Sequence, residues 1–273
     1  MIDFPLTRPS FEHQFGIQAL PADATPLQRT AEFEDEVRLK RELYRTHRDQ
    51  VFAVRPGSET LVEEVARWIR SQADWVQERS DEDPQLVDVG LQIQEDVAVV
   101  SDDAASGFPV VAGLVCFPSG WSIRGKLGQS MASTHGPVAG FAEHLLSRTV
   151  KLLASLRPLK TVHRYNWGIV PTADLALLPE RAAELNSARR QVDRQTAGQR
   201  CCFRVEYQTL TRMPDSGAIV FTILTRRRPL DQLTADQCRI MAGVLRTIPE
   251  PVADYKGLTP MIGPLREYFD ARG

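Results

Sequence analysis

The sequence has few residues of the kinds that build common metal and redox sites. It contains four cysteines and five histidines in 273 residues, and no two cysteines have the two-residue gap of a zinc knuckle or a redox dithiol. The glycine-rich dinucleotide fingerprint, the P-loop, HExxH and GxSxG are all absent. We expect the cysteines to be reduced and buried: Cys116, Cys201, Cys202 and Cys238.

The chain also lacks an excess of either charge and any long apolar run. Lys+Arg is 33 and Asp+Glu is 35, a net charge of −2, which argues against a nucleic-acid or membrane-surface binder. No apolar run approaches the roughly 20 residues of a membrane span, and the N-terminus has no secretory pattern. We therefore expect a cytoplasmic protein with no nucleic-acid or membrane partner. Its oligomeric state is left open.

Proline spacing and residue periodicity divide the chain into an arm and one domain. Residues 1–30 are proline-spaced and predict an arm wrapped over a domain formed by residues 31–273, which has helical extensions at both ends. Periodicity predicts helices at 31–50, 59–78 (with Ser58 as the cap), 137–156, 234–246, 250–256 and 259–270. It predicts strands at 85–88, 96–101, 109–116, 161–170, 201–213 and 217–226, and a loop with a short helix at 171–199. Hairpins without recurring βαβ units indicate an α+β fold around an antiparallel sheet.

The glycine-rich stretch 117–141 is one of two places that suggest a site. It carries an amphipathic ring, two cations and an isolated imidazole: Trp121, Arg124, Lys126 and His135. Glycine allows a tight chain path of the kind that loops follow around ligands. One interpretation is a cofactor site, and the other is a compact surface loop with a hydrogen-bonded histidine.

Strand 201–213 is the second place. Side chains alternate between the two faces of a strand, so Arg204, Glu206 and Gln208 share one face. Phe203, Val205 and Tyr207 share the other. The polar face either points to solvent or lines an internal pocket, where Arg204 pairs with an acid and Glu206 handles protons or holds an amine cation.

Strand 161–170 alternates in the same way. Val162, Arg164 and Asn166 lie on one face, and His163, Tyr165 and Trp167 lie on the other. Asn166 and Trp167 can each donate a hydrogen bond, and Arg164 suits a carboxylate or propionate partner. The alternative is an ordinary strand with an exposed arginine.

The histidines do not form a metal-binding pair. His135 and His144 are nine residues apart, so the helical i, i+3 or i, i+4 relation is missing. A single histidine is compatible with haem, whose macrocycle supplies the other four nitrogens. Alternatively, one of the four cysteines could ligate the haem iron as an axial thiolate.

Four motif blocks combine into a family resemblance. They are F-P-S-G-W-S-I-R-x-K-L-G, H-G-P-V-A-G-F-A-E, V-H-R-Y-N-W and R-V-E-Y-Q-T-L-T-R-M-P-x-S-G-A-I-V-F-T-I. Because these four blocks occur in this order, the chain resembles the haem-dependent oxidative N-demethylase family, from about Phe15 to Leu265. The resemblance implies a PAS-like fold that has helices to one side of the sheet and binds haem b. It also implies O2-dependent demethylation of a small secondary amine such as dimethylamine to formaldehyde, with electrons from a flavin and iron–sulfur reductase that uses NADPH.

The resemblance also implies roles for individual residues. His135 falls at the position of an axial iron ligand, and Glu206 falls at a catalytic position in the distal pocket. The remaining motif positions imply pocket-wall and cofactor contacts by Trp121, Arg124, Arg164, Asn166, Trp167 and Arg204. Two departures, Tyr207 and Leu224, stand where the family pattern has arginine, and we expect them to lie near the pocket.

Two rival functions stay open. The first is a haem-binding sensor or carrier without turnover, since fold does not fix function. The second is a haem-free scaffold subunit of an oxidase, which the departures at Tyr207 and Leu224 would suit. Formaldehyde production separates the enzyme from the sensor, and haem reconstitution separates both from the scaffold.

Overall fold

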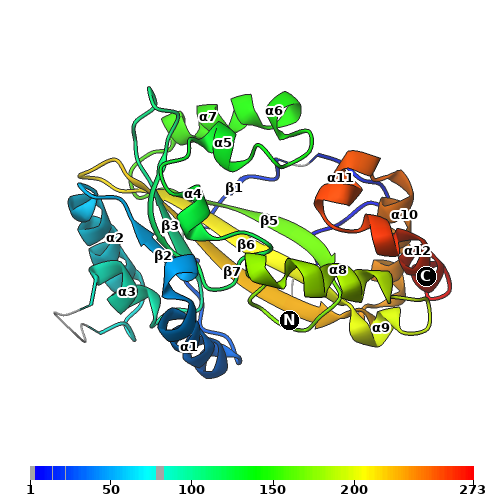
Figure 1. Cartoon of the computed structure of the whole chain (residues 1–273). Helices are drawn as coiled ribbons and strands as arrows, with labels where there is room; N and C mark the ends of the chain where they lie inside the picture. Colours follow the sequence, from blue (N-terminus) through cyan, green and yellow to red (C-terminus); the bar gives the residue numbers. More distant parts are fainter. Residues whose placement is uncertain (1–3, 14, 22, 78–82) are drawn as a thin grey trace.

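A computed structural model of the chain describes residues 4–13, 15–21, 23–77 and 83–273. Its centre is a seven-stranded antiparallel sheet in the order β1-β5-β6-β7-β3-β4-β2 (Figure 1). The strands are β1 (Gln18–Ala19), β2 (Phe52–Val54), β3 (Asp96–Val100), β4 (Val110–Leu114), β5 (Thr161–Val170), β6 (Cys202–Arg212) and β7 (Ile219–Pro229). The sheet and its flanking helices confirm the predicted α+β class.

The longest helices come early and late in the chain (Figure 1). The α-helices are α1 (Phe33–Val51), α2 (Glu59–Gln72), α3 (Gln85–Gly90), α4 (Ile123–Lys126), α5 (Met131–Thr134), α6 (Phe141–His144), α7 (Leu146–Ser155), α8 (Ala182–Arg190), α9 (Ala197–Arg200), α10 (Ala235–Thr247), α11 (Glu250–Tyr255) and α12 (Ile262–Asp270). Short 3-10 turns are Pro179–Arg181, Leu230–Gln232 and Thr259–Met261. None of the helices in the described ranges is long and apolar enough to cross a membrane.

Strands β5, β6 and β7 form a long meander that fixes which side chains share a face. Residues 161–170 of β5 pair in continuous register with residues 202–211 of β6, and β6 pairs along its whole length with β7. The predicted strands 161–170, 201–213 and 217–226 are confirmed to within three residues at each end. Because side chains alternate across a strand, Arg164, Asn166 and Glu206 lie on one face, and this face is called the His135 face below.

Helices cover both faces of the sheet. On the His135 face, α5 and α7 contribute Met131 and Leu153 to an apolar cluster with Val100 and Ile219. On the opposite face, α10 and α12 pack against Phe203, and α2 packs around Val97 in a separate cluster. The resemblance implied helices on one side only, and the structure corrects that expectation. The PAS-like description stays a prediction.

Two predicted elements are wrong. Residues 85–88 form the start of helix α3 instead of a strand, because a short apolar run has no periodicity that separates the two. The predicted helix 137–156 is broken into α6 and α7, and Pro137 lies in the preceding turn. Gly140, with a φ of 74°, ends the turn before α6, and Leu145, with φ −123° and ψ −29°, separates α6 from α7. Helix α2 ends at Gln72, and Ser58 caps it by position without a side-chain hydrogen bond.

The described part of the N-terminal arm runs along the C-terminal helices and then pairs with the sheet. The Phe4 ring lies 5.0 Å from the Phe203 ring in a tilted arrangement, and the Phe11 amide donates to Thr247 Oγ1 at 2.7 Å. Farther along, Gln18 and Ala19 form β1 at the edge of β5. Residues 1–3, 14 and 22 of the predicted arm lie outside the described ranges.

Candidate functional site

His135 is held so that one ring nitrogen is available to a ligand. It follows the single turn of α5, and its Nδ1 lies 3.0 Å from the Met131 carbonyl oxygen. A carbonyl only accepts hydrogen bonds, so Nδ1 must carry the proton and Nε2 keeps its lone pair. Metal-ligating histidines are commonly oriented by such a bond to a backbone carbonyl.

The electrostatic surroundings keep His135 neutral. Burial lowers its pKa most strongly, and the Arg164 and Lys126 cations lower it further, while the Met131 bond acts in the opposite direction. The ring also stacks on Phe141, with centroids 4.4 Å apart and planes at 13°. A neutral, oriented imidazole is the form that binds iron.

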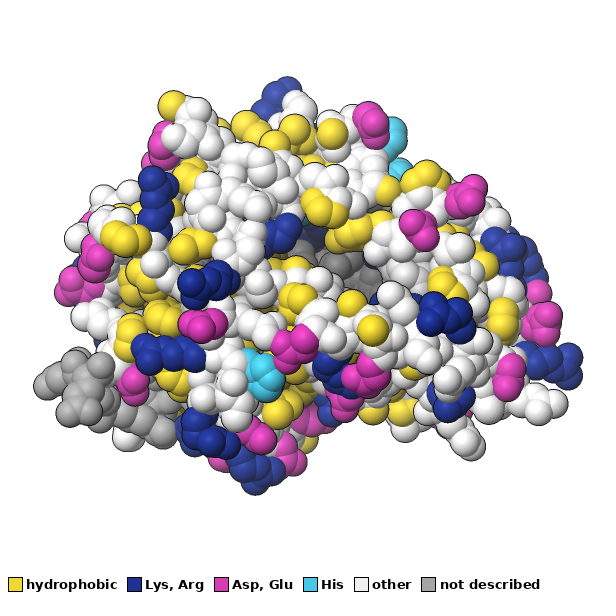
Figure 2. Space-filling view, viewed as in Figure 1, with side chains coloured by type: hydrophobic (Ala, Val, Ile, Leu, Met, Phe, Trp, Pro, Cys, Tyr) yellow, Lys and Arg dark blue, Asp and Glu magenta, His cyan; other side chains and the backbone are white. Residues whose placement is uncertain are grey.

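A hollow lies beside the His135 segment. A space of about 220 Å³ is lined by residues of the stretch 132–146, including His135, Val138 and Phe141. Figure 2 shows the surface hollowed below this segment, with basic side chains at its edge. His135, Arg164 and Lys256 are surrounded by protein on most sides, yet each keeps part of its surface accessible. Side chains that line a deep concavity are typically buried on most sides and exposed on one.

Strands β5 and β6 carry polar groups and a gap on the His135 face. Arg164 pairs in register with Gln208, Asn166 with Glu206, and Gly168 with Arg204. A Cβ atom added to Gly168 would meet no atom within 4 Å. The missing side chain therefore leaves open space in the middle of a polar strand face.

Arg164 lacks the partner that a buried cation needs. No hydrogen bond or ion pair to its guanidinium occurs among the described residues, and its Nε is buried and unsatisfied. Burial lowers the pKa of Arg164, which the nearby Glu206 partly offsets. Buried charges are normally paired, so an unpaired arginine close enough to His135 to lower its pKa indicates a site for an anionic ligand.

Glu206 is fixed by amide groups on the same face. Its Oε2 accepts from Asn166 Nδ2 at 3.2 Å and from Gln208 Nε2 at 3.0 Å. Its Oε1 lies 3.7 Å from Arg204 Nε. The carboxylate is 13% exposed, so it is held in one place and is still accessible to a small molecule.

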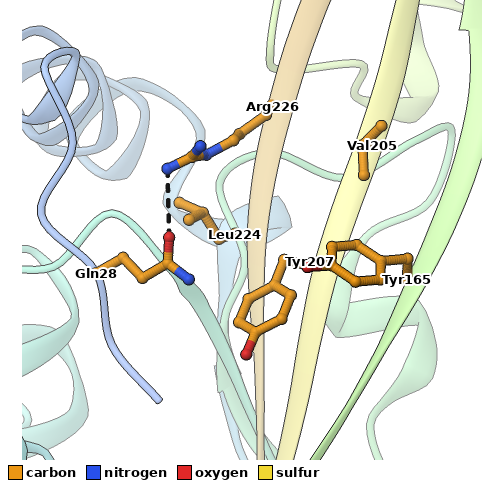
Figure 3. A pocket seen from close by; sticks show the side chains of 6 residues that line it. All are labelled: Gln28, Tyr165, Val205, Tyr207, Leu224 and Arg226. Atoms are coloured by element: carbon orange, nitrogen blue, oxygen red, sulfur yellow. Dashed lines mark hydrogen bonds between the residues drawn. The ribbon is translucent and has the colours of Figure 1, made fainter. Parts of the chain in front are cut away.

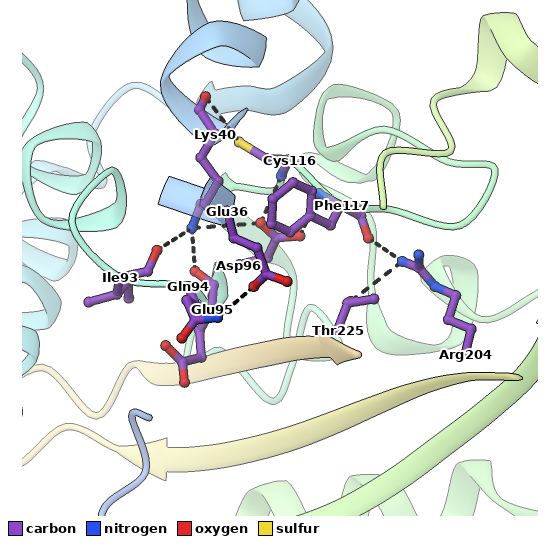
Figure 4. A network of polar contacts seen from close by, with 10 residues as sticks. All are labelled: Glu36, Lys40, Ile93, Gln94, Glu95, Asp96, Cys116, Phe117, Arg204 and Thr225. Atoms are coloured by element: carbon purple, nitrogen blue, oxygen red, sulfur yellow. Dashed lines mark hydrogen bonds and ion pairs between the residues drawn. The ribbon is translucent and has the colours of Figure 1, made fainter. Parts of the chain in front are cut away.

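Arg204 is tied into the structure by backbone groups. Its guanidinium donates to the carbonyl oxygens of Phe117 at 2.5 Å and Leu175 at 2.9 Å. Figure 4 shows it beside a buried network in which Asp96 accepts from the amides of Cys116 and Phe117. Arg204 therefore joins two loops and supports Glu206, which leaves it little capacity to bind a cofactor directly.

Asp96 is itself neutralised by a buried lysine. Lys40 of α1 lies 3.8 Å from Asp96 and donates to the carbonyl oxygens of Ile93 and Glu95 (Figure 4). Burial raises the pKa of Asp96 and Glu95, the latter to about 7. This network anchors α1 to the sheet and does not contact the hollow through any described hydrogen bond.

The remaining predicted residues are spread more widely. Trp121 is half-buried against the apolar cluster on the His135 face. Arg124 is exposed and pairs with Asp49 at 3.3 Å. Trp167 lies on the opposite face of β5, where its ring is 6.1 Å from Phe203. The structure thus brings His135, Arg164, Asn166 and Glu206 together and leaves Arg124 and the Trp167 ring outside.

The two departures from the family pattern lie away from the hollow. Tyr207 and Leu224 are register partners on the face opposite to Glu206. They border a small space with Gln28, Tyr165, Val205 and Arg226 (Figure 3). The expectation that they lie near the pocket is therefore wrong, since they leave the surroundings of Arg164 and His135 unchanged.

The cysteines are free and buried, as predicted. Burial raises the pKa of Cys201 to about 12 and also raises the pKa of Cys116 and Cys202. Each is therefore held as a thiol, and none lines the hollow beside His135. The axial-thiolate alternative receives no support from this arrangement.

Sequence reasoning missed Lys256. This residue follows α11, and its Nζ donates to the Trp167 carbonyl oxygen at 2.6 Å and lies 3.5 Å from Asn166 Oδ1. Burial lowers its pKa to about 8, while Glu206 raises it and Arg164 lowers it further. In the sequence Lys256 was only the last residue of the predicted helix 250–256, and no pattern there links it to β5.

One comparison bears on identity. A family model described as haem-dependent oxidative N-demethylase, alpha subunit-like matches residues 70–264. That range contains the glycine-rich segment, strands β3 to β7 and Lys256, so the match covers the whole candidate site. With most of its length matched in this way, the chain belongs to the haem-dependent oxidative N-demethylase alpha subunit-like family.

Proposed function

We propose that the chain binds haem b in the hollow beside His135 and oxidatively removes a methyl group from a small secondary amine such as dimethylamine. The observation that carries the proposal is the pairing of a neutral His135, with Nε2 available, and a buried Arg164 that has no partner. A histidine ligand and a propionate partner are what a haem requires of a protein. The family membership agrees with this choice.

The residues present fit the cofactor. His135 would hold the iron through Nε2, and Arg164 would hold a propionate, which satisfies its buried Nε. Gly168 leaves room on the strand face, and Trp121 supplies an apolar wall on the same side of the sheet. Haem, when bound, supplies the activation of O2 for oxidation of the N-methyl group.

The chain's own groups would bind and orient the amine. At neutral pH a small secondary amine is a cation, and the Glu206 carboxylate is an accessible acid beside Arg164 and Asn166. Asn166 and Gln208 hold the Glu206 carboxylate in one orientation through Oε2. We propose that Glu206 receives the ammonium and places its methyl group toward the cofactor. Electrons would come from a flavin and iron–sulfur reductase partner that uses NADPH.

Turnover of dimethylamine tests the function. A ferredoxin with its NADPH-dependent reductase serves as the electron donor, a carbon monoxide difference spectrum shows that the bound haem is reduced, and formaldehyde is measured. The wild type is expected to form formaldehyde in step with NADPH oxidation. Reduced haem without formaldehyde would contradict the proposal and favour the sensor or carrier.

Replacing Glu206 with glutamine should impair this reaction selectively. Glu206→Gln keeps the shape but removes the counter-ion, so kcat/KM for dimethylamine should fall at least about 100-fold. Haem affinity should stay within a factor of about three, because Glu206 is not assigned to the cofactor. Glu63→Gln, at an exposed position of α2, is the matched control. Equal loss in both variants would contradict a role for Glu206.

The sequence assigned Arg164 and Arg124 the same role as cofactor contacts, but the structure predicts that only Arg164 affects haem affinity. Arg164→Gln should weaken haem binding by about 10- to 100-fold, because a charge-assisted hydrogen bond in a buried site contributes about 1.5–3 kcal/mol. Arg124→Gln should leave haem affinity unchanged, since Arg124 is exposed and bound to Asp49. Titration of each purified variant with haem at the Soret band measures both. If Arg124→Gln weakened haem binding and Arg164→Gln did not, the propionate partner would be Arg124 in the glycine-rich stretch instead.

A further inference from the structure

Lys256 is anchored at an open stretch of the β5 edge. Strand β1 pairs with Val162 and His163, and among the described residues no strand pairs with β5 on that side farther along. The Lys256 ammonium fills this place by donating to the Trp167 carbonyl oxygen at 2.6 Å, and it lies 4.7 Å from the centre of the Trp167 ring. These two contacts fix Nζ and leave it able to make further bonds, since an ammonium has three donors.

Lys256 and Glu206 are joined through one amide. Lys256 Nζ lies 3.5 Å from Asn166 Oδ1, and Asn166 Nδ2 donates to Glu206 Oε2 at 3.2 Å. The lysine cation thus fixes which way the amide points, and the amide fixes the carboxylate. The two groups that an ammonium substrate would meet, an acid and an amine, lie on either side of Asn166.

The charged groups that act on Lys256 are Glu206 from β6 and Arg164 from β5, and the phenol of the preceding residue, Tyr255, interacts with Glu206 as well. Glu206 favours the cationic form of Lys256, whereas burial and Arg164 disfavour it. The field of Glu206 also helps to raise the pKa of Tyr255, after burial, so this phenol stays protonated at neutral pH. Burial thus brings the pKa of Lys256 to about 8, close enough to neutral pH for this residue to gain and lose a proton.

We propose that Lys256 accepts the proton that a bound ammonium must lose before its N-methyl group can be oxidised. The inference rests on the proposed function and adds a base to it. The ammonium N–H bond breaks, and its electron pair stays on the substrate nitrogen as the lone pair of the neutral amine. The lone pair of Lys256 Nζ forms the new N–H bond, and Glu206 becomes the counter-ion of the resulting lysine ammonium.

The step has a measurable proton balance. A small secondary amine has a pKa close to that of free lysine, about 10.4, so it arrives protonated. Below the Lys256 pKa of about 8, Lys256 must first release its own proton to water, and about one proton appears in solution for each amine bound. Above that pH, Lys256 is already neutral when the amine binds and the pair keeps the proton that the amine brings, so the release falls toward zero.

Calorimetry measures this release without turnover. Haem-loaded protein is titrated with dimethylamine in two buffers of different ionisation heat, from about pH 6.5 to about pH 9.5, a range that brackets the Lys256 pKa of about 8. For the wild type we expect a release that falls from about one proton to near zero, with its midpoint near pH 8. Lys256→Arg should show no such change, because a guanidinium stays charged throughout this range.

A second test variant, Lys256→Met, is compared with a matched control, Lys160→Met. Lys256→Met should lose the pH-dependent release while keeping haem affinity, and Lys160→Met, at an exposed position, should match the wild type. A release that is independent of pH in the wild type, or that persists in Lys256→Met, would overturn the proposal. So would a loss of haem affinity in Lys256→Met, which would make Lys256 a propionate partner instead.

The failure of this inference and the failure of the proposed function give different results. If haem-loaded wild type binds no dimethylamine, the amine-oxidising function itself is wrong. If it binds the amine with a constant proton release across the pH range, the function stands and only the role of Lys256 is rejected.

Discussion

Replacing His135 with alanine should abolish the haem spectrum of the wild type. The structure leaves Nε2 as the available nitrogen and keeps the imidazole neutral, so this residue supplies the iron ligand in our account. Removing it should weaken haem binding at least about 100-fold, more than is typical for loss of a residue that only orients a metal ligand. Titration of the purified variant with haem measures the effect.

Added imidazole provides the control for the His135→Ala variant. Free imidazole occupies the space of the lost side chain and should restore part of the Soret intensity, which a merely misfolded protein would not show. His47→Ala, at a position in α1 that faces Glu180, should bind haem as the wild type does. A normal spectrum in His135→Ala without imidazole would refute the ligand assignment.

The pH dependence of haem binding follows from the same group. Burial and two cations lower the pKa of His135, so its neutral, ligating form persists to a more acidic pH than that of an ordinary histidine. Haem binding through His135 should therefore hold across neutral pH and be lost only as the pH falls through that lowered pKa. Loss of binding near pH 6.5 or above would contradict the neutral site inferred from the structure.

Replacing Gly168 with leucine should exclude haem while leaving the fold intact. Gly168 lies near the C-terminal end of β5, where it pairs with Arg204, and faces open space on the His135 face. Leucine would fill that space from the strand, and we expect haem affinity to fall at least about tenfold. Because leucine suits a strand better than glycine, the melting temperature should not fall by more than about 2 °C.

A graded series makes the Gly168 prediction specific. Gly168→Ala adds only the Cβ atom, for which the structure has room, so haem affinity should change less than about threefold. Haem titration and thermal unfolding of the two variants separate a blocked hollow from a damaged sheet. If leucine and alanine bind haem equally well, the cofactor does not lie over this part of β5.

Alternation along the strands was the most informative feature of the sequence. It placed Arg164 with Asn166, and Arg204 with Glu206, on common faces, and the structure shows these faces joined in register. The same alternation placed Tyr207 with Phe203, away from Glu206. The expectation that Tyr207 lies near the pocket therefore overlooked a signal that the sequence contained.

Other features depend on contacts that no local pattern encodes. Arg204 donates to carbonyl groups 87 and 29 residues away, so its role in joining loops follows only from the tertiary structure. Lys256 reaches β5 across 89 residues. Helix α3 was misassigned because its apolar residues are buried on all sides, which removes the periodicity that distinguishes helix from strand.

The most direct test of the account is the absorption spectrum of the purified wild-type protein during titration with haem, followed by reduction and addition of carbon monoxide. We expect a Soret band that saturates at one haem per chain and shifts when carbon monoxide binds to the reduced form. A protein that develops no Soret band, even with haem in excess, would contradict the haem site and leave the scaffold function in its place.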